Sequence, residues 1–91
     1  MRILETSKFK KLRKKIKEEI EISALKEAIM RIMENPEAGK KLKGEFRELR
    51  AFRYSVKGQD RRLIYKAESD TIILFSFGPR EGIYKYKEKK C

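Results

Sequence analysis

Apolar residues recur at helical spacing in the first third of the chain. Residues 1–6 partly alternate between apolar and polar and predict a short strand, and Ser7 stands at the N-cap position of a following helix. One face of that helix carries apolar side chains spaced three, four and four residues apart. They are Phe9, Leu12, Ile16 and Ile20. The pattern predicts an amphipathic helix whose other faces are basic.

A second apolar stripe follows out of register with the first, with Ser23 near the break. It consists of Ile22, Leu25, Ile29, Ile32 and Met33. The change of register predicts two helices within about residues 7–34, packed as an antiparallel pair. The second helix is expected to end at Asn35-Pro36, because proline has no amide hydrogen and pushes the preceding residue out of the helical region. A basic loop is expected over residues 37–44.

From residue 45 onward the apolar period shortens to that of β-strands. Turns at 57–60 and 68–70 separate the predicted strands Phe46–Val56, Arg61–Ala67 and Thr71–Phe77. The last strand is apolar at both parities, which is typical of a central strand covered on both faces. A chain of 91 residues fits one domain. We therefore expect a single α+β domain over residues 1–91, with a sheet half at about 45–84 and a basic tail at 85–91.

Alternation along the first of these strands divides its side chains between two faces. One face carries Phe52, Tyr54 and Val56, and the other carries Arg53, Ser55 and Lys57. Arg50 has the wrong parity for the second face unless a β-bulge lies near Ala51. The sequence leaves open which of the two, Arg50 or Arg53, faces the functional site.

Lys and Arg number 25 against 14 Asp and Glu, a net charge of +11, and no histidine titrates near neutrality. Such an excess favours polyanionic partners. No apolar run approaches the roughly 20 residues of a membrane-spanning helix, and the N-terminus lacks the order of a signal peptide, so a soluble cytoplasmic protein is expected. The single cysteine, Cys91, leaves neither an intramolecular disulfide nor a Cys/His metal site. No metal and no cofactor are expected.

Most enzymatic constellations are missing from the sequence, which has no histidine, no usable cysteine nucleophile and no P-loop. The carboxylates of the strand half are scattered and are interpreted as surface charges. Guanidinium groups, by contrast, bind phosphate through paired hydrogen bonds, and aromatic rings stack on unpaired bases. The strand half supplies many such groups: Arg50, Arg53, Lys57, Arg61, Arg62, Lys66, Arg80, Tyr84 and Tyr86.

Several short motifs occur in order along the chain. They are Asn35-Pro36, Gly39-Lys40-Lys41-Leu42-Lys43-Gly44, Glu48-Leu49-Arg50, Arg62-Leu63-Ile64-Tyr65, and Gly78-Pro79-Arg80-Glu81 followed by Tyr84. Together they resemble the RelE/ParE superfamily of type II toxins over nearly the whole chain. The resemblance implies an α+β fold with two N-terminal antiparallel helices packed on a twisted, mostly antiparallel sheet of about four strands.

RelE-like members are ribosome-dependent endoribonucleases that cleave mRNA without a metal, and an antitoxin encoded beside them neutralises them. The resemblance thus implies an mRNA interferase whose partners are mRNA, ribosomal RNA and a cognate acidic antitoxin, with no membrane partner. In the reaction, a ribose 2′-hydroxyl attacks the adjacent phosphate and the 5′-oxygen leaves. The resemblance assigns Arg62 and Arg80 to stabilisation of the crowded phosphate and Tyr84 to a place beside the 2′-hydroxyl.

Further site residues are expected from the preceding strand, where Arg50 fits the motif and Arg53 fits the exposed parity. Additional RNA-binding residues are expected at Lys43, Lys57, Arg61, Lys66 and Tyr86. Arg61 occupies a position where the family usually has an aromatic residue. The basic face of the first helix, residues 8–17, is interpreted either as a solvated surface or as a contact to ribosomal RNA.

Two other functions stay open on the same fold. ParE-like members of the superfamily inhibit DNA gyrase without catalysing a reaction, and this function is favoured if Tyr84 and the strand arginines prove dispensable. A catalytically degenerate RNA-binding module is the other alternative, because a net charge of +11 binds RNA without cutting it.

Overall fold

The computed structural model of the protein describes residues 2–79, so the predicted sites Arg80, Tyr84 and Tyr86 and the tail 85–91 lie outside the described residues. The elements of the described part, in chain order, are β1 (Arg2–Glu5), α1 (Ser7–Lys14), α2 (Glu19–Glu34), β2 (Lys40–Lys41), a 3₁₀ turn η1 (Gly44–Phe46), β3 (Arg50–Val56), β4 (Gln59–Glu68) and β5 (Thr71–Gly78). The predicted order of a strand, two helices and a strand-rich half is confirmed.

The N-cap of α1 is Thr6 rather than the predicted Ser7. The Thr6 hydroxyl oxygen accepts a hydrogen bond from the Phe9 amide at 3.2 Å, as an N-cap side chain does. The same hydroxyl lies 3.1 Å from the Leu74 carbonyl oxygen, to which it can donate. One residue therefore begins the helix and ties it to β5.

Helix α1 is shorter than predicted, because it ends at Lys14 and α2 begins at Glu19. Ile20 therefore belongs to the second helix, where it is 49% exposed, and the predicted break near Ser23 was wrong. The charges mark the true break. Basic residues fill the last turn of α1, whereas Glu19 and Glu21 lie in the first turn of α2, and both placements are favoured by the helix dipoles.

Helix α2 ends where the sequence predicted. Asn35 leaves the helical region, with φ −144° and ψ 90°, directly before Pro36. Its side-chain oxygen accepts a hydrogen bond from the Glu37 amide at 3.2 Å, which supports the turn toward the sheet. Neither helix of the described part is long and apolar enough to cross a membrane.

The strands form a five-stranded sheet in the order β1-β5-β4-β3-β2. β1 runs parallel to β5, and the other neighbouring strands are antiparallel. The predicted fold class is confirmed with one strand more than expected, because Lys40–Lys41 of the predicted loop pair with β3. β3 begins at Arg50 rather than Phe46, which lies in η1, and β4 begins at Gln59 rather than Arg61.

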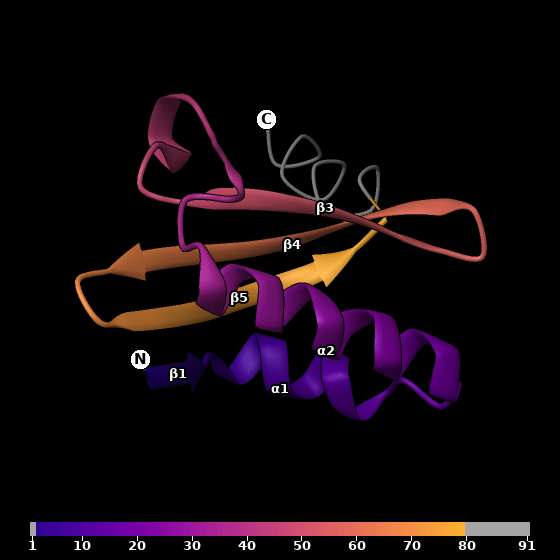
Figure 1. The fold of residues 1–91 in the computed structure, drawn as a ribbon. Helices are drawn as coiled ribbons and strands as arrows, with labels where there is room; N and C mark the ends of the chain where they lie inside the picture. The colour runs from indigo at the N-terminus through magenta and orange to yellow at the C-terminus, as the bar shows by residue number, and fades with distance from the viewer. Residues whose placement is uncertain (1, 80–91) are drawn as a thin grey trace.

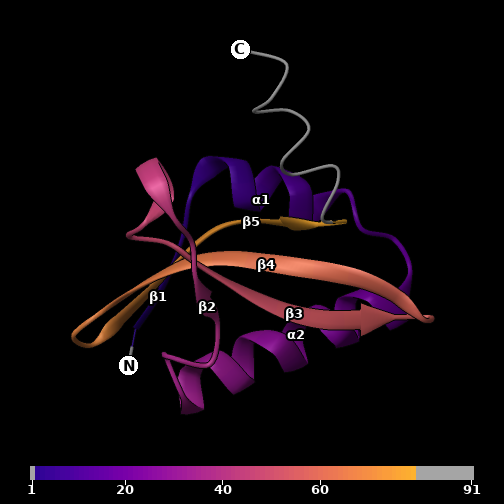
Figure 2. The ribbon, with the colours of Figure 1, turned by 90° about the horizontal axis from the view of Figure 1, so that it is seen from above.

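Both helices lie on one face of the sheet, as Figures 1 and 2 show, with α1 against β5 and α2 against β3. Between these layers lies a hydrophobic core drawn from both helices and from β4 and β5: Phe9, Leu25, Ala28, Ile32, Leu63, Tyr65, Ile72 and Leu74. Phe9 is completely buried and meets the Phe77 ring edge-on, with ring centroids 5.1 Å apart. The core thus joins the N-terminal helices to the strand-rich half.

The register between β3 and β4 is unbroken, so the bulge considered near Ala51 is absent. A register shift occurs instead between Ile64 and Tyr65, where β4 pairs with β5. Arg50 consequently has the parity of Phe52, which packs against the core, and Arg53 lies on the opposite face of the sheet.

A two-residue turn joins β3 to β4, formed by Lys57 and Gly58 with φ of 53° and 79°. Both values lie in the left-handed region that favours glycine and suits a tight hairpin. We expect Gly58→Ala to lower the free energy of unfolding by about 1 kcal/mol, the usual cost of a side chain in this conformation. Urea denaturation measures the effect, and an unchanged midpoint would contradict it.

Candidate functional site

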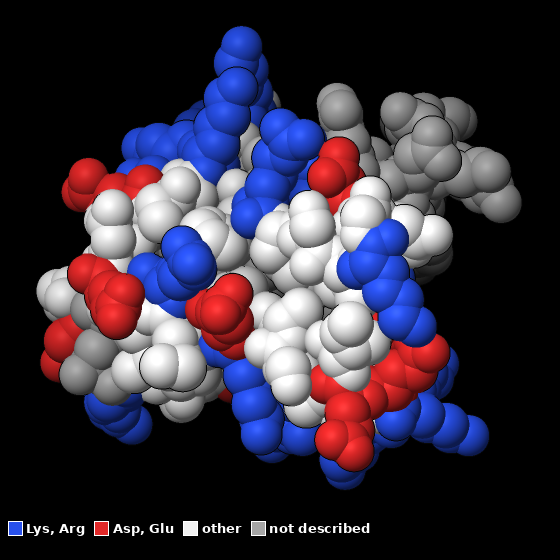
Figure 3. All heavy atoms as spheres, turned by 45° about the vertical axis from the view of Figure 1, so that its right-hand side comes forward, with Lys and Arg blue, Asp and Glu red and all other residues white. Residues whose placement is uncertain are grey.

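A groove of about 480 Å³ lies on the sheet beside β2 and β3. Its charged lining residues are all cations: Lys40, Lys41, Lys43, Arg53 and Arg62. Its other lining residues are neutral: Ala38, Leu42, Ala51 and Phe52. Figure 3 shows Lys and Arg side chains standing out along both the upper and the lower edge of the molecule. The groove therefore concentrates positive charge.

Arg53 and Arg62 are directly opposite each other on β3 and β4. Opposite residues of antiparallel strands share a face, with Cβ atoms about 5 Å apart, and two like charges there are destabilising. Arg53 is partly compensated by Asp60 at 3.2 Å, but that guanidinium is 68% exposed. Arg62 is half-buried and makes no ion pair with a carboxylate within residues 2–79. An anion bound between the two guanidinium groups would relieve their repulsion.

The lysines of the groove come from the segment that follows α2. Lys40 and Lys41 form β2, and Lys43 lies just before η1; all three side chains are exposed. Lys40 is the register partner of Ala51, which has the parity of Arg53, so Lys40 belongs to the same face. Of these three lysines the sequence singled out Lys43 alone. The run of three cations around Leu42 was the available signal for the other two.

Four predicted site residues do not line the groove: Arg50, Lys57, Arg61 and Lys66. Arg50 donates hydrogen bonds to backbone carbonyls of the segment before β2, at 2.8 Å to Gly39. Lys57 stands in the hairpin turn, where alternation ends, and its ammonium group lies 3.1 Å from a Glu18 carboxylate oxygen. The structure therefore corrects the placement of Lys57 beside Arg53.

Arg61 and Lys66 are held by carboxylates. Arg61 faces the helices, with its guanidinium 3.1 Å from a Glu21 carboxylate oxygen and its side chain 17% exposed. Lys66 lies 3.1 Å from Glu48 and 3.4 Å from Glu68, and hydrogen bonding to Glu48, then to Glu68, raises the pKa of its ammonium group. Neither residue lines the groove. The strand cations that the sequence predicted as one cluster therefore lie in different places: some line the groove, Arg61 faces the helices, and Lys66 lies near the end of β4.

The chain matches a known protein family along nearly its whole length. Residues 3–89 match the model of the ParE-like toxins of type II bacterial toxin-antitoxin systems. The chain belongs to this toxin family. No curated protein gives a significant sequence match.

Solved structures of the toxin fold agree with this assignment. The RelBE2 toxin-antitoxin complex from Mycobacterium tuberculosis superposes with a TM-score of 0.71 and 18% identity, over 87% of this chain and 96% of that chain. A chain of the intact RelBE complex from E. coli superposes with a TM-score of 0.67 and 21% identity, over 88% of this chain and 96% of that chain. A double mutant of the E. coli toxin RelE in its free state superposes with a TM-score of 0.69 and 21% identity, over 96% of this chain and 90% of that chain. At these identities the likeness concerns the fold.

Two tyrosines of the toxin's sheet remain protonated near neutral pH. Burial raises the pKa of Tyr54 to about 12, against the opposing effect of Arg61. Burial also raises the pKa of Tyr65, more than its hydrogen bond from Gly39 lowers it. Neither phenol is therefore suited to accept a proton from a ribose hydroxyl at neutral pH.

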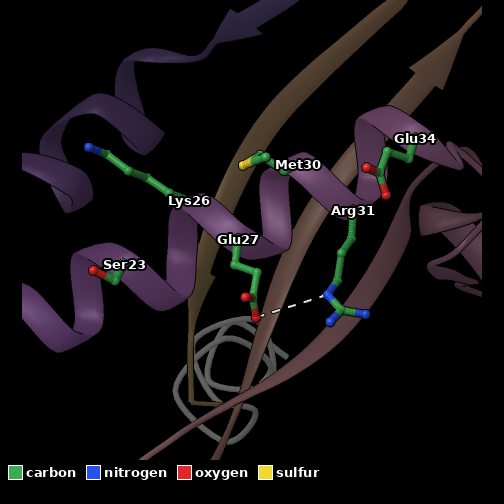
Figure 4. Close-up of a pocket in the computed structure, with 6 residues that line it drawn as sticks. All are labelled: Ser23, Lys26, Glu27, Met30, Arg31 and Glu34. Atoms are coloured by element: carbon green, nitrogen blue, oxygen red, sulfur yellow. Dashed lines mark ion pairs between the residues drawn. The ribbon is translucent and has the colours of Figure 1, made fainter.

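A second hollow of the toxin follows the outer side of α2 (Figure 4). It is lined by Ser23, Lys26, Glu27, Met30, Arg31 and Glu34. Figure 4 shows these side chains along one helix, with Arg31 turned toward Glu27 at 4.0 Å. Charges of both signs alternate there and both partners are well exposed, which is typical of a solvated helix face. The cationic groove is the stronger candidate for the functional site.

Proposed function

We propose that this toxin is a metal-free, ribosome-dependent endoribonuclease that cleaves mRNA and thereby inhibits translation. The observation that carries the proposal is the direct opposition of Arg53 and Arg62 in a groove lined by cations. Proteins concentrate like charge in this way where a polyanion binds, because each guanidinium can donate paired hydrogen bonds to phosphate oxygens. RNA supplies one phosphate per nucleotide along the groove.

Cleavage by this route needs no metal ion and no cofactor. The 2′-hydroxyl loses its proton and attacks the adjacent phosphorus, the phosphorus–5′-oxygen bond breaks, and the 5′-oxygen takes up a proton. Arg62 and Arg53 would stabilise the negative charge that accumulates on the phosphate oxygens. On the family resemblance, Arg80 would add a further cation and Tyr84 would lie beside the 2′-hydroxyl. Lys40, Lys41 and Lys43 would hold neighbouring phosphates.

The proposed partners are mRNA on the ribosome and a cognate acidic antitoxin. Solved relatives include toxin-antitoxin complexes, and the chain's net charge of +11 suits an acidic partner. The run of basic residues in α1 further supports a contact with ribosomal RNA, with a solvated surface as the alternative. The lysines of α1 are exposed and lie on the side of the molecule that carries the helices.

Induced expression of the toxin is expected to arrest translation and to leave new 5′ ends within mRNA coding regions. Primer extension on abundant transcripts measures these ends, and co-induction of the antitoxin encoded beside the toxin should abolish them. Growth arrest with intact transcripts would contradict the endoribonuclease proposal. Loss of DNA supercoiling by purified gyrase in the presence of the toxin would then support a ParE-type function.

A further inference from the structure

The hydroxyl of Tyr65 links strand β4 to the segment between α2 and β2. Tyr65 is completely buried on the helix-facing side of β4. Its hydroxyl oxygen accepts a hydrogen bond from the Gly39 amide at 2.8 Å and donates one to the Pro36 carbonyl at 2.8 Å. The phenol therefore uses both its donor and its acceptor on the segment between α2 and β2.

Arg50 holds the same segment from the edge of the sheet. Its guanidinium donates to the Gly39 carbonyl at 2.8 Å and, more weakly, to the Glu37 carbonyl at 3.4 Å. The amide and carbonyl of Gly39 are thus both bound by side chains of the sheet. A Cβ atom at Gly39 would lie 2.7 Å from the Tyr65 ring, so this close approach requires glycine.

The segment held in this way leads directly into β2. That strand has two residues, and within residues 2–79 its ladder partners are Arg50 and Ala51 alone. So short a ladder supplies little positional constraint of its own. Lys40, Lys41 and Lys43, which follow Gly39, line the groove opposite Arg53 and Arg62. The contacts at Gly39 therefore help to hold one cationic wall of the groove in place, together with the β2–β3 pairing and the hydrogen bond that the Leu42 amide donates to the Leu49 carbonyl at 3.1 Å.

We propose that Tyr65 is a positioning residue for RNA binding: through Gly39 and Pro36 it sets the distance between the lysine wall and the arginine pair of the groove. The inference rests on the proposed function, because it assumes that the groove binds RNA. Tyr65 is completely buried in the core on the helix-facing side of the sheet, so its proposed effect on RNA is indirect. Arg50 acts with it, which gives this arginine a role other than the catalytic one that the sequence predicted.

The test measures the affinity of Tyr65→Phe for a short, fluorescein-labelled 2′-O-methyl RNA, which the toxin cannot cleave. The variant keeps the buried ring and removes both hydrogen bonds. We expect affinity to fall about threefold to tenfold at low salt, with a flatter dependence of log Kd on log salt concentration. The slope falls by about 0.7 for each phosphate of a single strand that the protein no longer neutralises. Unchanged affinity and slope in a folded variant would overturn the inference.

Two matched variants separate positioning from general damage. Tyr54→Phe removes a second part-buried phenol of the same sheet, for which no hydrogen bond is found within residues 2–79, and should leave affinity and slope unchanged. Ile72→Val weakens the core beneath β5 without touching β2, and it should leave RNA binding unchanged as well. If either control weakens RNA binding as much as Tyr65→Phe does, the inference is also overturned.

Gly39→Ala should also displace the lysine wall from the arginine pair. If Tyr65→Phe fails to fold, Gly39→Ala is the variant that tests the inference. It keeps every charge and the phenol but introduces a methyl group against the ring. It should reproduce the weaker affinity and the flatter slope, and wild-type binding by a folded Gly39→Ala protein would contradict positioning.

A charge-removal variant distinguishes failure of the inference from failure of the proposed function. Lys41→Gln/Lys43→Gln should weaken RNA binding, and adding Tyr65→Phe to it should change affinity less than it does in the wild type, because the displaced wall then keeps only Lys40 of its three cations. If the double variant binds RNA like the wild type, the groove is not the RNA site and the proposed function fails. If it binds weakly while Tyr65→Phe and Gly39→Ala bind normally, positioning alone fails.

Discussion

Replacing Arg62 with alanine is expected to lower the rate of mRNA cleavage by about 10²–10³-fold, the usual effect of removing one donor that stabilises charge in a transition state. The free energy of unfolding should stay the same or rise, because the change removes the repulsion between Arg62 and Arg53. Cleavage is measured by primer extension in a translating extract, and stability by urea denaturation. A fall in cleavage without a fall in stability is the signature of a functional residue.

Arg61→Ala is the matched control, since the two arginines are adjacent on β4 but point to opposite faces. Arg61 faces α2, where its guanidinium lies 3.1 Å from Glu21 and both side chains are largely shielded. The substitution should cost about 1 kcal/mol of stability and leave cleavage within about twofold of wild type. Equal cleavage by the Arg62→Ala and wild-type toxins would remove the observation on which the proposed function rests.

Phe9→Ala should produce the largest decrease in stability, about 3–5 kcal/mol. Phe9 is completely buried and contacts the Phe77 ring, so the substitution removes the anchor of α1 and leaves a cavity under β5. Small domains have about 5–15 kcal/mol of stability in total, so the variant would retain only part of it. The midpoint of urea denaturation and the melting temperature both report the change.

Met30→Ala serves as the control for Phe9→Ala because Met30 is 60% exposed on the outer side of α2. It should change the free energy of unfolding by less than about 0.5 kcal/mol. Similar decreases in both variants would mean that the stability of the domain does not come from the core around Phe9.

The helix boundaries show how one signal can mislead where another was available. Apolar spacing alone joined Ile20 to the first helix, although Ile20 is half-exposed in α2. The switch from basic to acidic residues between Lys14 and Glu19 marked the break correctly, because charges interact with helix ends whatever the apolar register does. The end of α2 at Asn35 was predictable since proline acts locally on its own backbone.

The site was predictable only in part. Alternation along β3 placed Arg53 on the face away from the helices, and the resemblance assigned Arg62 to catalysis; both residues line the candidate groove. Arg61 was expected to bind RNA, but the partner that holds it, Glu21, is 40 residues distant in sequence. Lys57 left its expected face because the turn conformation ended the alternation. Contacts between distant segments are not visible in local patterns, whereas the turn predicted at 57–60 did indicate that the alternation ends near Lys57.

By itself the sequence determined the charge, the toxin family and the order of helices and strands, because composition, ordered motifs and apolar period are properties of neighbouring residues. Only the tertiary structure decided that Arg53 and Arg62 meet across β3 and β4, that Lys40 and Lys41 add a fifth strand beside them, and that Arg50 binds Gly39 instead of joining the groove. The physical reason is register. The pairing of strands and the hydrogen bond that the Gly39 amide donates to the Tyr65 hydroxyl bring together residues far apart in the chain, and this placement gathers the cations that line the groove.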